Sequence, residues 1–223
     1  MDLLLLNFFN LKILGESAPY LWSGFKMTVL LCLLLIPLGV AAGLAVALAS
    51  TLKSKWLRWP MVAYVDFFRA FPPLVLLMFI AFGLPFLGVD VPAFVAVALA
   101  FMLNTSSYYG EIFRAGIESI PRQQFEAARS TGLNAAQTMA WVIVPQATRN
   151  MIPDLISNTI EVVKLTSIAS VVALPELLYA ARQGQALTYN ATPIIAAGFI
   201  YLACLWPLVR LLSRFEHRQI ALH

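Results

Sequence analysis

Long apolar runs recur along the chain, and charged residues gather in the short stretches between them. The hydrocarbon core of a membrane is about 30 Å thick, and a helix crosses it with about 20 mainly apolar residues. The runs are long enough for this, although the fourth carries several polar and charged side chains and is the least hydrophobic. The pattern predicts an all-α integral membrane protein with five transmembrane helices, at about 27–50, 59–84, 91–113, 150–174 and 191–212.

The segments outside these runs predict smaller features. Residues 1–23 hold apolar clusters broken by polar residues, which predicts an interfacial helix that is too short and too polar to cross the membrane. Tyr20 and Trp22 of this segment are expected at the level of the lipid headgroups. The pair Pro72-Pro73 lies inside the second run and predicts a kink or a break there. A polar connection is expected over 175–190, before the last span.

One polar stretch interrupts the apolar pattern between the third and fourth runs. Pro121 can begin a helix there, because its missing N–H would be unpaired in the first turn anyway. Gly132 can end that helix in the left-handed conformation, and Asn134 can cap a second helix by means of a capping box. Pro145 removes a donor and disfavours helix at Val144, so the second helix is expected to end there. The stretch therefore predicts a helix, a glycine turn and a second short helix at a membrane surface.

The composition agrees with a membrane protein. Of the 223 residues, 61% are hydrophobic and 12% are charged, whereas about 25% are charged in soluble domains. A single transmembrane domain over 1–223 is expected. The net charge of +4 does not indicate nucleic-acid binding, because the basic residues lie at the ends of apolar runs.

Several kinds of reactive site have no counterpart in the sequence. Cys32 and Cys204 fall inside apolar runs and are expected to be small buried hydrophobic residues without a disulfide. No metal-ligand spacing and no catalytic constellation occur, and no Gly-x-x-x-x-Gly-Lys-Ser/Thr loop is present. We therefore expect neither an enzyme nor a nucleotide site in this chain.

The basic residues predict the orientation, because cytoplasmic loops carry an excess of Lys and Arg. With five spans, one side collects ten of them: Lys53, Lys55, Arg58, Arg114, Arg122, Arg129, Arg149, Arg210, Arg214 and Arg218. The other side has three: Lys12, Lys26 and Arg182. The polar stretch and the C-terminus are therefore expected in the cytoplasm, and the N-terminus outside.

Two acid–base pairs lie within predicted spans. Asp66 with Arg69, and Glu161 with Lys164, are spaced at i, i+3 and so share a helix face. Charge within a span costs about 2.5–3.5 kcal/mol or more per residue at its centre. Each pair can simply neutralise itself, or it can line a cavity that meets a charged solute. The two readings weigh evenly for Glu161 and Lys164, and the structural one is favoured for Asp66 and Arg69. Candidate neutral contacts on the substrate path are Asn104, Thr166 and Ser167.

The polar stretch holds Glu126-Ala127-Ala128, a glycine four residues after the second alanine, and later the pair Val144-Pro145. This spacing resembles the EAA loop of ABC importer permeases. In that family the first helix of the loop is a coupling helix, which docks in a groove of a separate ATPase subunit. The resemblance implies a type I ABC importer permease with a cytoplasmic coupling loop at about 114–149. Its implied ATPase-coupling residues are Glu126, Ala127, Ala128, Arg129, Gly132 and Pro145.

Three further segments resemble the polar amino acid uptake branch of these permeases. They run from Asp66 to Val75, from Ser107 to Ile117 and from Lys164 to Ser170. The resemblance implies an importer of the bacterial inner membrane that moves an amino-acid-like substrate. Its implied partners are two ATPase subunits that bind ATP and Mg²⁺, a second permease that is identical or a sister, an extracytoplasmic solute-binding protein and membrane lipid.

The chain departs from the family pattern at two places. Ala70-Phe71 replaces a common Gly-Thr, and Leu165 stands where an acidic residue is frequent. An acid lost near the pocket would weaken binding of a cationic side chain. An opine, a sulfur-containing amino acid or a compatible solute therefore remains an alternative substrate. A carrier or scaffold without an ATPase is a further alternative, although such carriers usually show inverted repeats.

Overall fold

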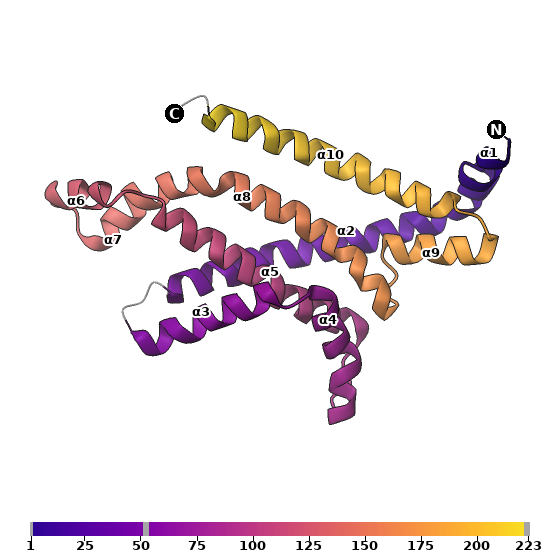
Figure 1. The fold of residues 1–223 in the computed structure, drawn as a ribbon, viewed down its shortest axis with the longest axis horizontal. Coiled ribbons are helices and arrows are strands. Elements are labelled where there is room, and N and C mark those ends of the chain that lie inside the picture. Colours follow the sequence, from indigo (N-terminus) through magenta and orange to yellow (C-terminus); the bar gives the residue numbers. More distant parts are fainter. Residues whose placement is uncertain (1, 51–53, 221–223) are drawn as a thin grey trace.

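The computed structural model describes residues 2–50 and 54–220, so Lys53 lies outside the described residues. Within this part the chain consists of helices and short connections, without a strand (Figure 1). The α-helices are α1 (Asp2–Phe8), α2 (Leu11–Ser50), α3 (Lys55–Ala70), α4 (Pro73–Met78), α5 (Ala93–Glu118), α6 (Arg122–Ser130), α7 (Ala135–Thr138), α8 (Val144–Leu165), α9 (Leu177–Thr188) and α10 (Thr192–Ile220). Two π-helical turns, Phe79–Gly83 and Met139–Ile143, and two 3₁₀ segments, Leu84–Leu87 and Thr166–Val172, join or extend them.

Four helical stretches of the described chain are long and apolar enough to cross a membrane, and a bent fifth stretch makes five. The first is longer than expected, because α2 runs without a break for 40 residues from Leu11. The prediction of a separate interfacial helix over residues 1–23 is therefore wrong, except for the short helix α1. Pro19 and Pro37 lie inside α2 without ending it.

The helices α2 and α5 share the most extensive contact of any helix pair in the described chain, and small residues lie in it. A Cβ added to Gly43 would lie 2.5 Å from the Cβ of Tyr109 and 2.8 Å from the backbone nitrogen of Gly110. A Cβ on Gly39 would lie 2.6 Å from the Thr105 hydroxyl oxygen. The two glycines therefore serve packing within this chain, as small residues do where helix backbones approach.

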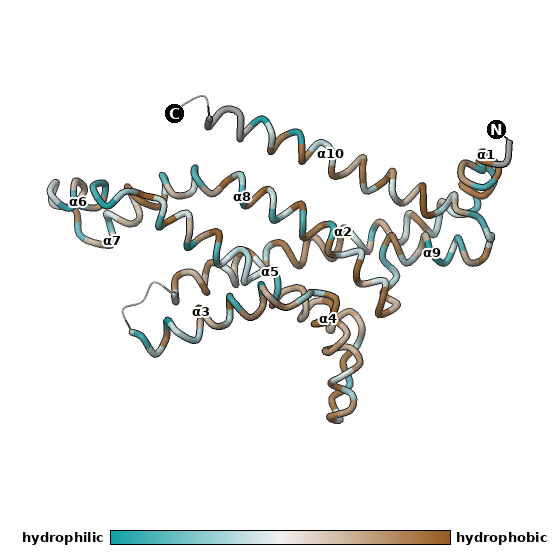
Figure 2. The backbone as a smooth tube through the Cα atoms, in the orientation of Figure 1, coloured by the Kyte–Doolittle hydropathy of each residue, from teal (hydrophilic) through white to brown (hydrophobic). Residues whose placement is uncertain are grey.

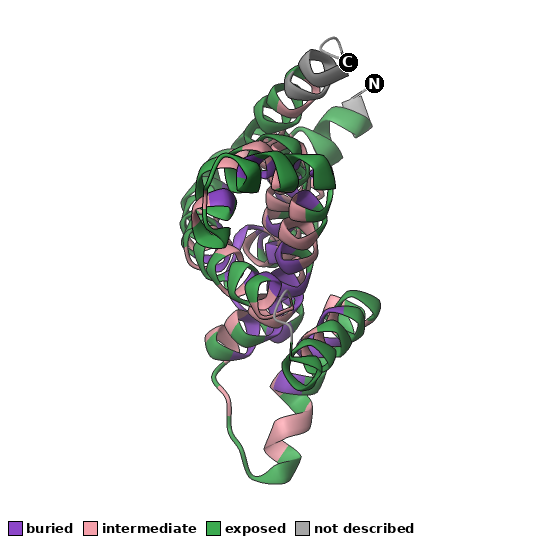
Figure 3. Ribbon diagram, turned by 90° about the vertical axis from the view of Figure 1, so that its left-hand side faces the viewer, coloured by how far each residue is buried: buried purple, intermediate pink, exposed green. Residues whose placement is uncertain are grey.

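The main core lies where α2, α4, α5 and the end of α8 meet. Its fully buried members include Leu31, Leu35, Leu77 and Phe101. Figure 3 shows the buried residues on the sides where the helices face one another, and exposed residues around the outside. The exposed sides are largely apolar on α2 and α10, as expected of helices surrounded by lipid.

The second predicted span is broken, as Pro72-Pro73 indicated. The helix α3 and the stretch Pro73–Leu87 meet at an angle of 100°. Phe71 and Pro72 have extended backbones at the break, and Pro73 begins α4. Figure 1 shows the α4 stretch leaving the bundle to the side, so the break moves this segment away from α3.

The expected end of the helix before Pro145 is wrong. A π-helical turn, Met139–Ile143, leads directly into α8, and Val144 has helical dihedrals. The Val144 amide bonds to the carbonyl of Met139, five residues back. This wider hydrogen-bonding pattern accommodates Pro145, which has no N–H to donate, because its ring does not have to fit a regular i to i−4 turn. The fourth apolar stretch therefore runs from Ala135 to Val172 and not from about residue 150.

The connection expected over 175–190 contains a helix, α9, packed against α2 and α10. Glu176 caps it, and its fully buried carboxylate accepts from the amides of Leu178 and Tyr179 and from the Tyr201 hydroxyl. Burial raises the pKa of the Glu176 carboxyl, although these hydrogen bonds lower it. The buried acid thus joins the start of α9 to Tyr201 of α10.

The N-terminal segment meets the turn between α9 and α10. The Asn10 amide donates to the Thr192 hydroxyl at 3.0 Å, across 182 residues of sequence. The Asn190 side chain donates to the Leu6 carbonyl, and the Ala191 amide donates to the Asn7 carbonyl. This terminal junction anchors the segment before α2 to the beginning of α10.

Candidate functional site

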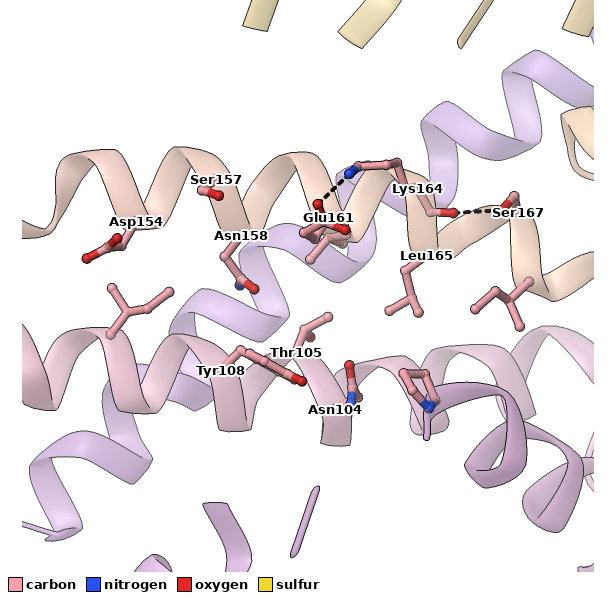
Figure 4. Close-up of a pocket in the computed structure, with 14 residues that line it drawn as sticks. Asn104, Thr105, Tyr108, Asp154, Ser157, Asn158, Glu161, Lys164, Leu165 and Ser167 are labelled. Atoms are coloured by element: carbon pink, nitrogen blue, oxygen red, sulfur yellow. Dashed lines mark hydrogen bonds and ion pairs between the residues drawn. The ribbon is translucent and has the colours of Figure 1, made fainter. Parts of the chain in front are cut away.

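A cavity of about 600 Å³ lies between α4, α5 and α8. One wall is made by residues of α5, the other by residues of α8 and the 3₁₀ turn that follows it (Figure 4). Pro73, the first residue after the 100° break, closes one end. The lining residues are Pro73, Asn104, Thr105, Tyr108, Ile112, Asp154, Ser157, Asn158, Glu161, Val162, Lys164, Leu165, Ser167 and Ile168.

The charged groups of this cavity come from α8. The Lys164 ammonium forms an ion pair with the Glu161 carboxylate, and both side chains are about half or more exposed. Asp154 also lines the cavity and makes no ion pair with a described residue. The cavity therefore carries an acid–base pair and one further carboxylate, which suits a solute with both an ammonium and a carboxylate group.

The structure brings together four of the seven residues predicted for the substrate path. Asn104, Glu161, Lys164 and Ser167 all line the cavity. Thr166 does not, because its side chain is fully buried and donates to the Val163 carbonyl.

Asp66 and Arg69 lie outside the cavity, and the pair predicted between them does not form. Arg69 instead reaches α5, where its Nη1 lies 3.5 Å from Oε1 of Glu111. Asp66 faces a second cavity of about 590 Å³ between α2, α3 and α5. The i, i+3 spacing puts the two residues on one side of a helix, but the neighbouring helix α5 supplies Arg69 with a nearer acid.

Several lining residues were missed by the sequence analysis. Asp154 and Asn158 lie seven and three residues before the predicted Glu161, so the three share one face of α8. That spacing was readable in the sequence and could have identified Asp154 and Asn158. Thr105 and Tyr108 had no such signal, because they lie in a polar run of α5 in which Ser106, Ser107 and Tyr109 do not line the cavity.

Two amides have contrasting environments at the cavity wall. Asn104 donates to the Phe68 carbonyl at 3.1 Å, so it holds α3 to α5 as well as lining the cavity. The side-chain nitrogen of Asn158 is buried and has no hydrogen bond among the described residues, although the Tyr109 hydroxyl lies near this amide. A buried donor without a partner is costly, so Asn158 is the less well satisfied of the two amides.

The predicted coupling loop forms one end of the molecule (Figure 1), and hydrophilic positions gather there (Figure 2). The helix α6 turns Ala128 and Phe125 inward, against a cluster of Ile120, Ile143, Ala147 and Met151. Its other side is exposed and carries Glu126, Ala127 and Arg129. The loop is therefore seated on the bundle by one face and presents a polar face outward.

The turn after α6 has the predicted backbone. Gly132 has φ +88°, the left-handed region that glycine adopts at low cost. Asn134 caps α7, and its side chain and that of Gln137 each bond the other residue's backbone amide, which is a capping box. Pro121, expected as the first helical residue, is the N-cap of α6.

The helix α8 connects the loop with the cavity. Its first residues, Ala147 and Met151, belong to the cluster under α6, while Asp154, Glu161 and Lys164 further along line the cavity. At 1.5 Å per residue, about 24 Å of helix separates Pro145 from Glu161. The surface of the loop and the cavity thus share one helix.

Comparison with known proteins identifies the relatives of this arrangement. Residues 14–220 match the family described as binding-protein-dependent transport system inner membrane component. The probable amino-acid ABC transporter permease protein YckA of Bacillus subtilis is 36% identical over 198 residues, which are 88% of each chain. The L-cystine transport system permease protein TcyB of the same organism is 36% identical, over 89% of this chain and 84% of that one. The octopine transport system permease protein OccM of Rhizobium meliloti is 32% identical, over 93% and 89%.

Solved structures give the same picture. A chain in the crystal structure of an amino acid ABC transporter with histidines has a TM-score of 0.87 and 36% identity, over 94% of this chain and 98% of that chain. A chain of the MetNI methionine ABC transporter, in an inward-facing conformation, has a TM-score of 0.74 over 89% and 95%. At 19% identity, this second likeness concerns the fold alone.

Proposed function

This chain belongs to the family of binding-protein-dependent transport system inner membrane components, and from that premise we propose how it selects a solute and couples to ATP hydrolysis. It is an amino acid ABC transporter permease, a membrane subunit and not an enzyme, since ATP is hydrolysed in a separate subunit in this family. We propose that the cavity between α5 and α8 takes a polar amino acid. The loop over 114–149 would dock on the ATPase.

The cavity of about 600 Å³ is the observation that carries the proposed substrate class. The Lys164 ammonium attracts a carboxylate, and the Asp154 carboxylate attracts an ammonium group. A free amino acid offers matching groups to both, within a cavity of the size that small ligands use.

Two features favour a substrate whose side chain is neutral. Glu161 is paired with Lys164, whose other N–H groups can still donate to a solute carboxylate, so Asp154 is the lining carboxylate that remains for an ammonium group. Leu165, which stands where an acidic residue is frequent in the branch, lines the cavity and makes that part apolar. Relatives of similar identity are described as permeases for cystine and for octopine. A sulfur-containing amino acid or an opine is therefore the second candidate, and a compatible solute a third.

The proposed assembly has two permease subunits, two ATPase subunits that bind ATP and Mg²⁺, and an extracytoplasmic solute-binding protein. The exposed face of α6 with Glu126, Ala127 and Arg129 supports the ATPase contact. Gly132 and Pro145 shape the backbone on either side of α7. In the proposed orientation the loop and the C-terminus face the bacterial cytoplasm, and the N-terminus lies outside.

Reconstitution of this chain with its ATPase and its solute-binding protein tests the proposal. ATP hydrolysis is measured with a panel of amino acids presented on the binding protein. Neutral polar amino acids are expected to stimulate hydrolysis more than cationic ones. Family membership argues against a carrier or scaffold without an ATPase, and failure to assemble with any ATPase would revive that alternative.

A double variant then tests the cavity. Glu161→Gln with Lys164→Gln removes both charges and is expected to weaken the apparent affinity for the solute. Arg58→Gln is the matched control, because Arg58 lies on α3, outside this cavity. Unchanged affinity in the folded double variant would make the pair structural. If no amino acid in the panel stimulates ATP hydrolysis by the assembled complex, the substrate is not an ordinary amino acid.

A further inference from the structure

Arg69 occupies a junction that neither ATPase docking nor solute binding explains. It lies in the last turn of α3, just before the 100° break. Its guanidinium carbon lies 5.6 Å from the ring centroid of Tyr108, within the range of a cation–π contact. The Tyr108 hydroxyl donates to the Arg69 carbonyl at 3.3 Å. Arg69 and Tyr108 are therefore joined both through the side chain and through the backbone.

On its other side Arg69 meets a chain of ion pairs along α5. Its Nη1 lies 3.5 Å from the Glu111 carboxylate, which accepts two hydrogen bonds from Arg114 at 2.8 and 2.6 Å. Arg114 also donates to Glu118 at 2.6 Å. Glu118 is the last residue of α5, and α6 begins four residues later at Arg122. The chain of charges thus ends where the coupling loop starts.

The partners of Arg69 line two different cavities. Tyr108 lines the proposed solute cavity, whereas Glu111, Arg114 and Glu118 line the cavity between α2, α3 and α5. A guanidinium is suited to this position, because its plane can stack on an aromatic ring while its N–H groups face a carboxylate. A movement of the Tyr108 ring would change both the stacking and the geometry of the ion pair with Glu111.

We propose that Arg69 is a positioning residue that couples occupancy of the solute cavity to the loop end of α5. A solute against Tyr108 biases the position of Arg69, and the series Glu111, Arg114 and Glu118 conveys that bias toward α6. The inference rests on the proposed function, because it assumes that the cavity takes the solute and that the loop meets the ATPase. Arg69 itself does not contact the solute.

The test uses the assembled complex of this chain with its ATPase and solute-binding protein. The quantity measured is the ratio of ATP hydrolysis with the liganded binding protein to hydrolysis without it. Arg69→Gln is expected to lower this ratio about fivefold to tenfold, at the low end of measured couplings between sites. Glu111→Gln is expected to give the same loss. The double variant should lose no more than the larger single one, because both interrupt one chain.

Arg58→Gln provides the matched control on the same helix. Arg58 lines the second cavity but forms no ion pair with a described residue, so this variant should keep the wild-type ratio. A purely structural brace would give a different result. Arg69→Gln would then lower the thermal stability of the complex while the ratio stayed unchanged, and that outcome overturns the inference. Losses at Arg69 and Glu111 that multiply in the double variant would overturn it as well.

A conservative variant keeps the inference testable if Arg69→Gln fails to assemble. Arg69→Lys retains the charge toward Glu111 but not the flat surface over Tyr108. It should assemble and give a ratio between those of wild type and Glu111→Gln, whereas a full wild-type ratio refutes the stacking role. The wild-type complex separates the two proposals. Without stimulation of the wild type by any amino acid the proposed substrate class fails, whereas equal stimulation of wild type and Arg69→Gln overturns only the role of Arg69.

Discussion

Substitution of Gly43 by alanine should weaken the packing of α2 on α5, although alanine favours a helix. The added Cβ would lie 2.5 Å from the Tyr109 Cβ, 2.8 Å from the Gly110 nitrogen and 3.0 Å from the Ser106 carbonyl oxygen. Two of these atoms belong to the backbone, so rotation of a side chain cannot relieve the contact. The two helices must separate, and overpacking of this kind costs about 1–3 kcal/mol.

The same helix provides the control for this experiment. Gly15 also lies in α2, and a Cβ placed on it meets nothing within 4 Å. Gly15→Ala should therefore show only the gain in helix propensity, up to about 1 kcal/mol. Gly39→Ala should cost less than Gly43→Ala, because its nearest contact is the hydroxyl of Thr105, which can rotate away.

Thermal unfolding in detergent measures the difference. For a chain of this length, each kcal/mol shifts Tm by about 2–4 °C. Gly43→Ala is expected to unfold several degrees below Gly15→Ala, and its Tm should also fall below that of the wild type. Equal midpoints for the two variants would refute the reasoning, because they would mean that α2 and α5 do not meet through Gly43.

Three further predictions concern the loop and the buried acid. Gly132→Val should lower the stimulation of ATP hydrolysis, because a β-branched residue at φ +88° is strained by about 1–2 kcal/mol or more; Gly88→Val, at φ +79° and outside the loop, should keep it. Glu126→Lys should reduce co-purification of the ATPase, since it reverses the charge on the exposed face of α6, and an unchanged yield would count against docking there. The raised pKa of the Glu176 carboxyl means that its protonated form stabilises the folded state. This stabilisation is present below the ordinary pKa of 4.5 and is lost as pH rises through the higher pKa of the folded state. Thermal midpoints from pH 5 to pH 8 should therefore fall more steeply in wild type than in Glu176→Gln, and parallel curves would contradict this.

Features that depend on local chemistry were predictable from the sequence. The left-handed Gly132, the capping box at Asn134 and the break at Pro72-Pro73 each depend on a few adjacent residues. The apolar runs also predicted the all-helical class, because a run of about 20 mainly apolar residues is typical of a transmembrane helix. The length of α2 was not predictable in this way, because the charged residues near its start, Lys12 and Glu16, are exposed, and Ser17 is buried beside Gly184 of α9.

Three features were missed or misread. Pro145 was expected to end a helix, but the π turn directly before it in the same backbone lets the helix continue. Arg69 was paired with Asp66 by spacing, but α5 places Glu111 closer to it. Glu176 looked like part of a polar connection, and only the packing of α9 on α2 and α10 buries it. The cases of Arg69 and Glu176 require knowledge of which helix lies opposite.

The terminal junction between Asn10 and Thr192 has a consequence for biosynthesis. Asn10 leaves the ribosome early, yet its amide finds its partner only after another 182 residues have been made. Until then α2 and α5 can already pack, whereas the segment around Leu6 and Asn7 lacks the side chain and amide that hold it. The order of synthesis therefore makes this junction a late contact, and its protection from proteolysis would report that the chain has reached the start of α10.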